Sequence, residues 1–310
     1  MWLKYGVDKD GLLVCIEDIP RGKTLLNCPY CQGNLIAKKG KVKEYHFFHE
    51  EQTCHPVAKR DFPNLPLYDN FNIQLSAKGL KQLKLLWHEY GTKNYPISFD
   101  LIPSELIKAG MLRKNVYLRP PGYEFSEQGK IPVGALELPL FNEVQEPLLL
   151  KKLQKLTLAF EHALYKNALD LTYRHIDLKL YRAQLKRILS CTLYFLEVKT
   201  DKENLYKIGV TARPITQRVA EIEIDLLPYY KTVAIKVLGV WSHRGNVELY
   251  FKHRFHGFNY TIGSLTEYFK FNASDAQSIL IELQQMLPKT LSEVEIDILT
   301  NNSTFIQVAI

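Results

Sequence analysis

Residues 192–211 read TLYFLEVKTDKENLYKIGVT, and this stretch decides the fold of the C-terminal part of the chain. Two apolar runs rich in β-branched and aromatic residues, 191–198 and 205–210, lie on either side of the polar run 199–204. Apolar runs of this length that are separated by a short polar segment are typical of neighbouring antiparallel strands. We therefore predict two strands that form a hairpin.

The pattern downstream of this hairpin alternates between helix and strand. Apolar residues at helical spacing predict helices at 215–224 and 246–255, while strand-like runs occupy 232–240 and 268–271. The order strand, strand, helix, strand, helix, strand predicts an α+β domain. In such a domain we expect a small central sheet flanked by helices.

The polar residues of this segment suit the hydrolysis of a phosphodiester bond. A carboxylate such as Glu248 can hold a divalent cation, which polarises the phosphate. Arg218 can donate a fork of hydrogen bonds to phosphate oxygens. The hydroxyl of Tyr194 has an ordinary pKa of about 10, so it acts as a base only where a metal ion or an arginine lowers that value. Gly209 allows backbone or substrate to approach closely.

The same segment resembles the GIY-YIG nuclease superfamily over residues 191–271. Thr192-Leu193-Tyr194 stands where that superfamily has Gly-Ile-Tyr, and Lys207-Ile208-Gly209 stands where it has Tyr-Ile-Gly. Arg218 and Glu248 match the superfamily's arginine and its metal-binding glutamate. The resemblance implies an endonuclease that uses Mg²⁺ or Mn²⁺ to hydrolyse phosphodiester bonds in DNA. The catalytic candidates are Tyr194, Tyr206, Lys207, Arg218, Glu248 and His253.

Two positions depart from the superfamily pattern. Lys207 takes the place of a catalytic tyrosine, as in a KIG-type subset of phage and bacterial proteins, and Tyr206 lies one residue away on the opposite face of the strand. The asparagine that closes the superfamily pattern has Asn272 as its nearest candidate. A lysine with a lowered pKa could position the water or stabilise the phosphate. The alternative is a protein that binds DNA or RNA through the same fold without cleaving it.

Cysteines and histidines cluster near the N-terminus. Cys28-Pro29-Tyr30-Cys31 is a C-x₂-C knuckle, and His46, His49, Cys54 and His55 follow it. Zinc takes four nitrogen or sulfur ligands in a tetrahedron, and a knuckle of this kind points two thiolates at one ion. The second pair of ligands must come from the four residues that follow. The expected set is Cys28, Cys31, His49 and Cys54, with His46 as the first substitute.

The sequences CPYC at 28–31 and HFFH at 46–49 resemble the N-terminal zinc region of competence CoiA-like proteins and other prokaryotic nuclease-associated proteins. The likeness covers about residues 26–60. It implies that this part of the chain is a structural zinc module beside a nuclease. In that arrangement the module helps to hold DNA.

A long helical segment is predicted between these two regions. Residues 148–190 contain neither glycine nor proline, and apolar residues recur at steps of three and four in two registers. This pattern predicts one long helix or a helical hairpin. Such a segment could space two domains or form a homodimeric coiled coil. A dimerising interaction protein is therefore a third functional alternative.

Residues 61–145 carry weaker signals. Helices are predicted at 80–90 and 104–109, and the stretch 119–139, which is rich in proline and glycine, is expected to be a loop. The run 99–106 followed by the run 111–117 is compatible with the helix and wing of a winged-helix unit, a pattern that many α+β linkers share. We assign no role to this region from the sequence.

Composition and charge are compatible with a folded protein that has a polyanionic partner, and the resemblance to nucleases makes nucleic acid, and DNA in particular, the expected partner. Of 310 residues, 46% are hydrophobic and 24% are charged, the net charge is +7, and no apolar run is long enough to span a membrane. The N-terminus lacks an apolar signal segment, so we expect a cytoplasmic location. Five cysteines are too few and odd in number for a disulfide framework.

The sequence divides into five expected parts. These are a zinc-binding module at 1–60, a mixed region at 61–145, the helical segment at 146–190, a GIY-YIG-like domain at 191–290 and a tail at 291–310. The GIY-YIG-like domain ends with an amphipathic helix at 274–287.

Overall fold

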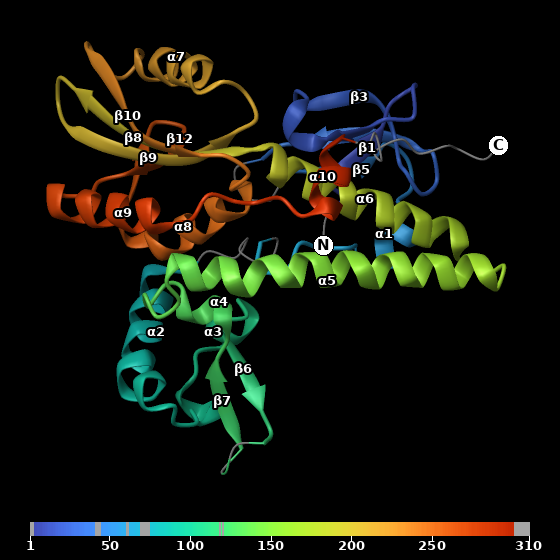
Figure 1. Ribbon diagram of the computed structural model, residues 1–310, viewed down its shortest axis with the longest axis horizontal. Helices are drawn as coiled ribbons and strands as arrows, with labels where there is room; N and C mark the ends of the chain where they lie inside the picture. The colour runs from blue at the N-terminus through green and yellow to red at the C-terminus, as the bar shows by residue number, and fades with distance from the viewer. Residues whose placement is uncertain are drawn as a thin grey trace. The chain divides into compact units, whose positions relative to one another are not determined.

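The computed structural model describes residues 3–40, 45–59, 62–68, 75–117, 119 and 121–300, and it has the mixed α+β architecture that the sequence predicts (Figure 1). The chain divides into two compact units. The first unit combines residues 1–66, 147–187 and 291–310, and the second combines residues 67–146 and 188–290. The domain boundaries that we expect from the sequence remain predictions.

An antiparallel sheet of five strands forms the centre of the first unit. Its strands are β1 (Tyr5–Val7), β2 (Leu13–Cys15), β3 (Gly22–Asn27), β4 (Asn34–Lys38) and β5 (His46–His49), in the order β2-β1-β3-β4-β5. The 3₁₀ helix η1 (Ile16–Asp18) follows β2, and helix α1 (His55–Lys59) follows β5. Leu35 on β4 and Phe47 on β5 are both buried. The ladder between these two strands therefore contributes to the core of this unit.

The long helical segment is a hairpin of two antiparallel helices, α5 (Leu138–Tyr165) and α6 (Leu171–Ser190) (Figure 1). The hydroxyl of Tyr181 donates a hydrogen bond to the carbonyl oxygen of Leu149 over 2.8 Å. The rings of Phe160 and His175 lie 5.0 Å apart further along the pair. Of the two structures that the sequence allows, the hairpin is confirmed.

Helix α5 begins earlier than the sequence predicts and passes through Pro147. A proline inside a helix costs about 3 kcal/mol because it removes a backbone donor and its ring clashes with the preceding turn. Leu138 and Phe141, on the N-terminal side of the proline, are fully buried. Burial of two such side chains stabilises the helix by about 1.5–3 kcal/mol each, which offsets the cost of the proline.

Helix α6 packs against the sheet of the first unit. Its residues Ile176, Leu180 and Ala183 join the same core cluster as the strand residues. The hydroxyl of Tyr30 donates to Oδ1 of Asp177 on α6 over 2.7 Å. The apolar seam of α6 is therefore covered within its own unit, and the structure gives no support for a homodimer that uses this seam.

The second unit contains another antiparallel sheet of five strands, in the order β10-β8-β9-β12-β11. The elements are β8 (Thr192–Thr200), β9 (Asn204–Thr211), α7 (Ile215–Leu226), β10 (Val233–Trp241), η5 (Gly245–Val247), α8 (Glu248–Arg254), η6 (His256–Phe258), β11 (Asn259–Ile262), β12 (Leu265–Phe269) and α9 (Ala273–Gln285). The predicted hairpin of the first two strands is confirmed, and its register places Tyr194 opposite Gly209. Strand β11 is an element that the sequence pattern did not reveal.

Helices cover both faces of this sheet, as expected, with α7 on one side and α8 and α9 on the other (Figure 1). Tyr194 on β8 shares a core cluster with Ile222 of α7. Phe195, the next residue of β8, belongs to a different cluster that includes Phe251 of α8. Because successive strand residues point to opposite faces, the two clusters lie on opposite sides of the sheet.

The mixed region folds around a small core of its own. Its elements are α2 (Ala77–Glu89), η3 (Gly91–Lys93), η4 (Phe99–Leu101), α3 (Ser104–Lys108), β6 (Leu112–Asn115), β7 (Gly122–Phe125) and α4 (Glu127–Lys130). The two predicted helices are confirmed as α2 and α3. The expectation of a loop over 119–139 is wrong in part, since buried Phe125 anchors β7 against β6 and Ser126 caps α4.

One more helix, α10 (Glu293–Thr300), lies in the stretch that we expected to be a tail, so the helix at 274–287 is not the last one. Ile298 of α10 is fully buried, which explains why this stretch folds. Residues 301–310 of the expected tail lie outside the described residues.

Within the described part of the chain, no helix has the length and apolarity needed to cross a membrane. The cytoplasmic location remains a prediction.

Candidate functional sites

Tyr194 on β8 lies opposite Gly209 on β9. Tyr194 has only 1% of its surface exposed. A Cβ atom at position 209 would lie 2.6 Å from the hydroxyl of Tyr194, which is far too close. The glycine of the KIG sequence therefore leaves the space that the tyrosine hydroxyl occupies.

Helix α7 brings Arg218 to the same hydroxyl. Nε of Arg218 donates to the Tyr194 hydroxyl over 3.5 Å, and Nη1 donates to Glu221 over 3.0 Å. Burial raises the pKa of Tyr194, and the guanidinium of Arg218 opposes this shift only in part. Tyr194 is therefore a neutral phenol at neutral pH, which can donate or accept a hydrogen bond.

Lys207 is held by a chain of alternating charges. Its Nζ atom lies 3.1 Å from Oε2 of Glu267, and Oε1 of Glu267 lies 3.0 Å from Nζ of Lys252. Lys252 also pairs with Oε1 of Glu248, one turn earlier in α8, over 3.1 Å. The Nζ atom of Lys207 lies 4.6 Å from the centre of the Tyr268 ring, which adds a cation–π contact. These contacts link the strand lysine to the helix glutamate through Glu267 and Lys252.

The exposed fraction of the side chain differs strongly among the four ion-paired residues Lys207, Glu267, Lys252 and Glu248. The side chain of Lys207 is 5% exposed and that of Glu267 is 42% exposed. Burial lowers the pKa of Lys207, although the carboxylate of Glu267 opposes the shift. At Glu267 burial favours the neutral acid, but Lys252 and Lys207 outweigh it and hold the pKa at about 2. The carboxylate that reaches solvent is therefore ionised at neutral pH, and the lysine behind it has a weakened hold on its proton.

Tyr194 and Arg218 interact electrostatically with the ion-paired residues Lys207, Glu267, Lys252 and Glu248. Arg218 and Lys252 are among the charges that lower the pKa of Lys207, while Glu267 and Glu248 contribute to the raised pKa of Tyr194. Three cations, Lys207, Arg218 and Lys252, thus lie close to three carboxylates, Glu221, Glu248 and Glu267. Such a site can hold a phosphate through its cations and offer a carboxylate to a metal ion.

The other two predicted site residues, Tyr206 and His253, are both buried. The ring of Tyr206 packs between Phe195 and Phe271, with centroid distances of 5.8 Å to each, in the core on the other side of the sheet. His253 is buried in α8, five residues after Glu248, which corresponds to about 140° around the helix. The structure therefore brings together Tyr194, Lys207, Arg218 and Glu248.

The sequence left Glu267 and Lys252 unassigned. Lys252 has a local signal, because it follows Glu248 at the i,i+4 spacing that favours an ion pair on a helix. The run Thr266-Glu267-Tyr268-Phe269 stands out in the sequence, but nothing in it indicates a contact with Lys207, which lies 60 positions earlier. Asn272, the nearest candidate for the superfamily asparagine, caps helix α9, where its side chain accepts a hydrogen bond from the backbone of Asp275 over 2.8 Å.

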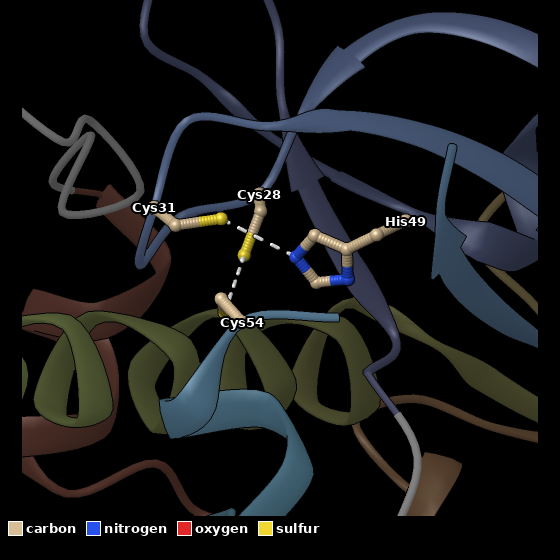
Figure 2. A group of neighbouring side chains, drawn as sticks. All are labelled: Cys28, Cys31, His49 and Cys54. Carbon is tan, nitrogen blue, oxygen red and sulfur yellow. Dashed lines mark hydrogen bonds between the residues drawn. The ribbon is translucent and has the colours of Figure 1, made fainter. Parts of the chain in front are cut away.

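The four expected zinc ligands come together in the first unit (Figure 2). Cys28 follows β3, Cys31 lies in the next turn, His49 ends β5 and Cys54 precedes α1. The Sγ atoms of Cys28 and Cys54 lie 4.0 Å apart, and Sγ of Cys31 lies 3.3 Å from Nε2 of His49. All four ligand atoms lie within 4.8 Å of one another.

This arrangement fits a tetrahedral metal ion. Zinc bonds of about 2.3 Å to sulfur and about 2.0 Å to nitrogen place neighbouring ligand atoms about 3.5–3.8 Å apart. The two separations above bracket that range. Gln32 adopts a left-handed φ of 62°, which closes the knuckle. His46, the alternative ligand, begins β5 opposite Lys38 and is not part of the cluster. The Cys₃His cluster could therefore bind a metal such as zinc.

Residues 192–284, from the first strand of the second sheet to the helix after its last strand, match a known domain family. They match the T5orf172 domain. This domain is found in phage and bacterial proteins that resemble homing endonucleases, and it indicates a nuclease-like or DNA-binding function. The T5orf172 match supports neither the resemblance to the GIY-YIG superfamily nor the resemblance to CoiA-like zinc regions. Both resemblances therefore remain predictions. No curated protein and no solved structure shows significant similarity to the chain.

Proposed function

We propose that this protein is an endonuclease that hydrolyses phosphodiester bonds in DNA with the help of a divalent metal ion. The T5orf172 match supports the nuclease-like class. The observation that carries the proposal is the combination of Arg218 on the Tyr194 hydroxyl with the ion-pair chain that runs from Lys207 to Glu248. Cations that suit a phosphate are here electrostatically coupled to carboxylates.

Glu248 is the residue that would hold Mg²⁺ or Mn²⁺. Magnesium keeps several of its waters and takes one or two protein carboxylates, so a dedicated cage is not required. The side chain of Glu248 is 16% exposed, and Lys252 balances its charge over 3.1 Å. A divalent ion in place of this ammonium group would polarise the phosphate and offset its developing charge. The donor set therefore fits the ion.

The remaining residues hold the substrate and the water. Arg218 has a raised pKa, because its bonds to Tyr194 and Glu221 outweigh the effect of burial, so it stays charged and can bind phosphate oxygens. The neutral hydroxyl of Tyr194 orients the attacking water. Lys207, whose pKa is lowered by burial, faces the phosphate in the place of the superfamily tyrosine and stabilises its charge.

The Cys₃His cluster is the basis of the role that we propose for the first unit, a structural zinc module that helps to hold DNA. Cys28, Cys31, His49 and Cys54 hold a structural zinc ion that ties the knuckle to β5 and α1. The resemblance to CoiA-like zinc regions supports a role of this unit in holding DNA. A net charge of +7 for the chain agrees with a polyanionic partner.

Cleavage of supercoiled plasmid tests the proposal. Zinc-loaded protein is incubated with plasmid and with single-stranded DNA, in Mg²⁺, in Mn²⁺ and without an added ion. We expect nicking or linearisation that depends on the added ion. Intact DNA under every condition, with protein that is folded and still contains zinc, would contradict the proposal.

A second function is favoured by two features of the site. Lys207 replaces the tyrosine that cleavage uses in the superfamily, and Lys252 already neutralises Glu248. Both features suit a domain that binds DNA or RNA without cutting it. Salt-dependent retardation of DNA or RNA in a gel, with no cleavage in any divalent ion, would establish this alternative.

A further inference from the structure

A cavity of about 230 Å³ is lined by residues of helix α2, of the hairpin β6–β7 and of the segments next to them, and by none of the residues of the proposed cleavage site. Figure 1 shows α2 beside this hairpin. Aromatic and charged side chains from one continuous part of the chain line it. Those that matter here are Trp87, Tyr95, Arg113, Glu124, Phe125 and Lys130. No role has been assigned to this region so far.

The aromatic wall of the cavity is held in place. The rings of Trp87 and Phe125 meet edge to face, with centroids 4.9 Å apart and an interplanar angle of 84°. A Cβ atom at Gly91 would lie 2.2 Å from the Trp87 ring, so the glycine allows the indole to lie directly on the backbone. Tyr95 is 60% exposed at the edge of the cavity. The cavity thus combines a fixed indole with an accessible phenol ring.

Charged groups complete the lining. Nε of Arg113 donates to Oε1 of Glu124 over 2.6 Å, and Asn115 donates to the other carboxylate oxygen over 2.8 Å. The Arg113 side chain is still 64% exposed. Lys130 pairs with Glu127 over 2.9 Å at the cavity wall. Cations are therefore available beside the aromatic rings, and a carboxylate is fixed among them.

This combination selects a particular class of ligand. The cavity is smaller than the roughly 300–1,000 Å³ of sites that enclose a drug-sized molecule, so it suits one planar ring system. Unpaired bases stack on aromatic side chains and on guanidinium planes, while lysine and arginine hold the strand through its phosphates.

We propose that the pocket formed by Trp87, Tyr95, Phe125 and Arg113 binds an unpaired base of a nucleic acid strand. This gives residues 87–130 the role of a second contact to the substrate, outside the T5orf172 domain. The binding itself does not require that the T5orf172 domain cleaves.

The test compares two probes of equal length and charge. One is a fluorescent 20-residue deoxythymidine strand, and the other replaces its bases with abasic spacers. Binding is measured by anisotropy without added Mg²⁺, so the result is independent of cleavage. The variants are Tyr95→Ala and Arg113→Ala. The matched control is Tyr165→Ala, which removes a tyrosine that is 87% exposed in α5.

We expect the native protein and the Tyr165→Ala control to bind the thymidine strand about tenfold more tightly than the abasic strand, since stacking of even one base has an effect of this size. Tyr95→Ala and Arg113→Ala should reduce that preference while they retain the native circular dichroism spectrum. Equal binding of the two strands by the native protein would overturn the proposal. A preference that both variants keep in full would also overturn it, because the stacking would then occur elsewhere.

Discussion

The Nζ atom of Lys207 lies 3.1 Å from Oε2 of Glu267, a residue 60 positions further along the chain. This contact accounts for a charged lysine in β9 whose side chain is only 5% exposed. A buried ammonium group without a partner would be strongly destabilising. Glu267 therefore makes a buried lysine at position 207 compatible with the fold and also links Lys207 to Lys252 and Glu248.

Replacement of Glu267 by Gln should destabilise the protein by about 1–2 kcal/mol at pH 7, a value discounted because the side chain is 42% exposed. The pKa of Glu267 is depressed to about 2 from an ordinary value of 4.5. Its stabilising effect is thus complete above the ordinary value and is lost as the pH falls towards 2. Urea unfolding of both proteins between pH 7 and pH 3 measures this difference. A difference that stays constant or grows on acidification would contradict the assignment.

A methyl group at position 209 should displace the Tyr194 hydroxyl, because it would lie 2.6 Å away. We expect Gly209→Ala to lower stability by about 1–3 kcal/mol and to reduce cleavage. Gly257→Ala is the matched control, since no atom lies within 4 Å of a Cβ there. Thermal unfolding and plasmid nicking are measured for both variants. If Gly209→Ala behaves like the control, the close packing of Tyr194 on Gly209 is wrong.

Removal of one zinc ligand should release the metal. Cys31 is exposed, so Cys31→Ser changes packing little but removes one of the four donors. The native protein is expected to keep one zinc ion per chain after dialysis against a mild chelator, and Cys31→Ser is expected to lose it. His55→Ala, outside the four-residue set, should keep the ion. Elemental analysis decides the matter, and full retention by Cys31→Ser would exclude Cys31 as a ligand.

The hairpin of α5 and α6 should depend on the hydrogen bond from Tyr181 to the Leu149 carbonyl, which measures 2.8 Å. Tyr181 is fully buried, so Tyr181→Phe leaves a buried carbonyl without this donor and should cost about 1–2 kcal/mol. Tyr165→Phe, at an exposed position, should be neutral. Urea unfolding of the two variants provides the comparison. Equal stabilities would mean that the Tyr181 contact contributes nothing measurable.

Local sequence patterns predicted the elements that depend on local signals. The apolar runs around 199–204 gave the β8–β9 hairpin, and the knuckle at Cys28 led to the four residues that now surround one point. Contacts between residues that are far apart in the sequence could not be predicted from local patterns. The packing of α6 on the first sheet joins Tyr30 to Asp177, 147 residues apart, and neither residue carries a pattern that names its partner.

The charged chain illustrates the same limit. Lysines and glutamates on strands and helices are usually solvated, so their types alone do not indicate a buried network. Only the folded sheet places Glu267 between Lys207 and Lys252. Strand β11 and helix α10 were missed for a related reason, because each is short and depends on burial against distant elements.

The most direct test of the central claim is the plasmid-cleavage rate of Glu248→Gln in Mg²⁺. The control is Glu223→Gln, which changes an exposed glutamate on α7 in the same way. The account predicts that Glu248→Gln loses at least about 100-fold in rate, as expected when a metal ligand is removed, while the control cleaves like the native protein. Cleavage by Glu248→Gln at the native rate would contradict the account and would place the active site elsewhere.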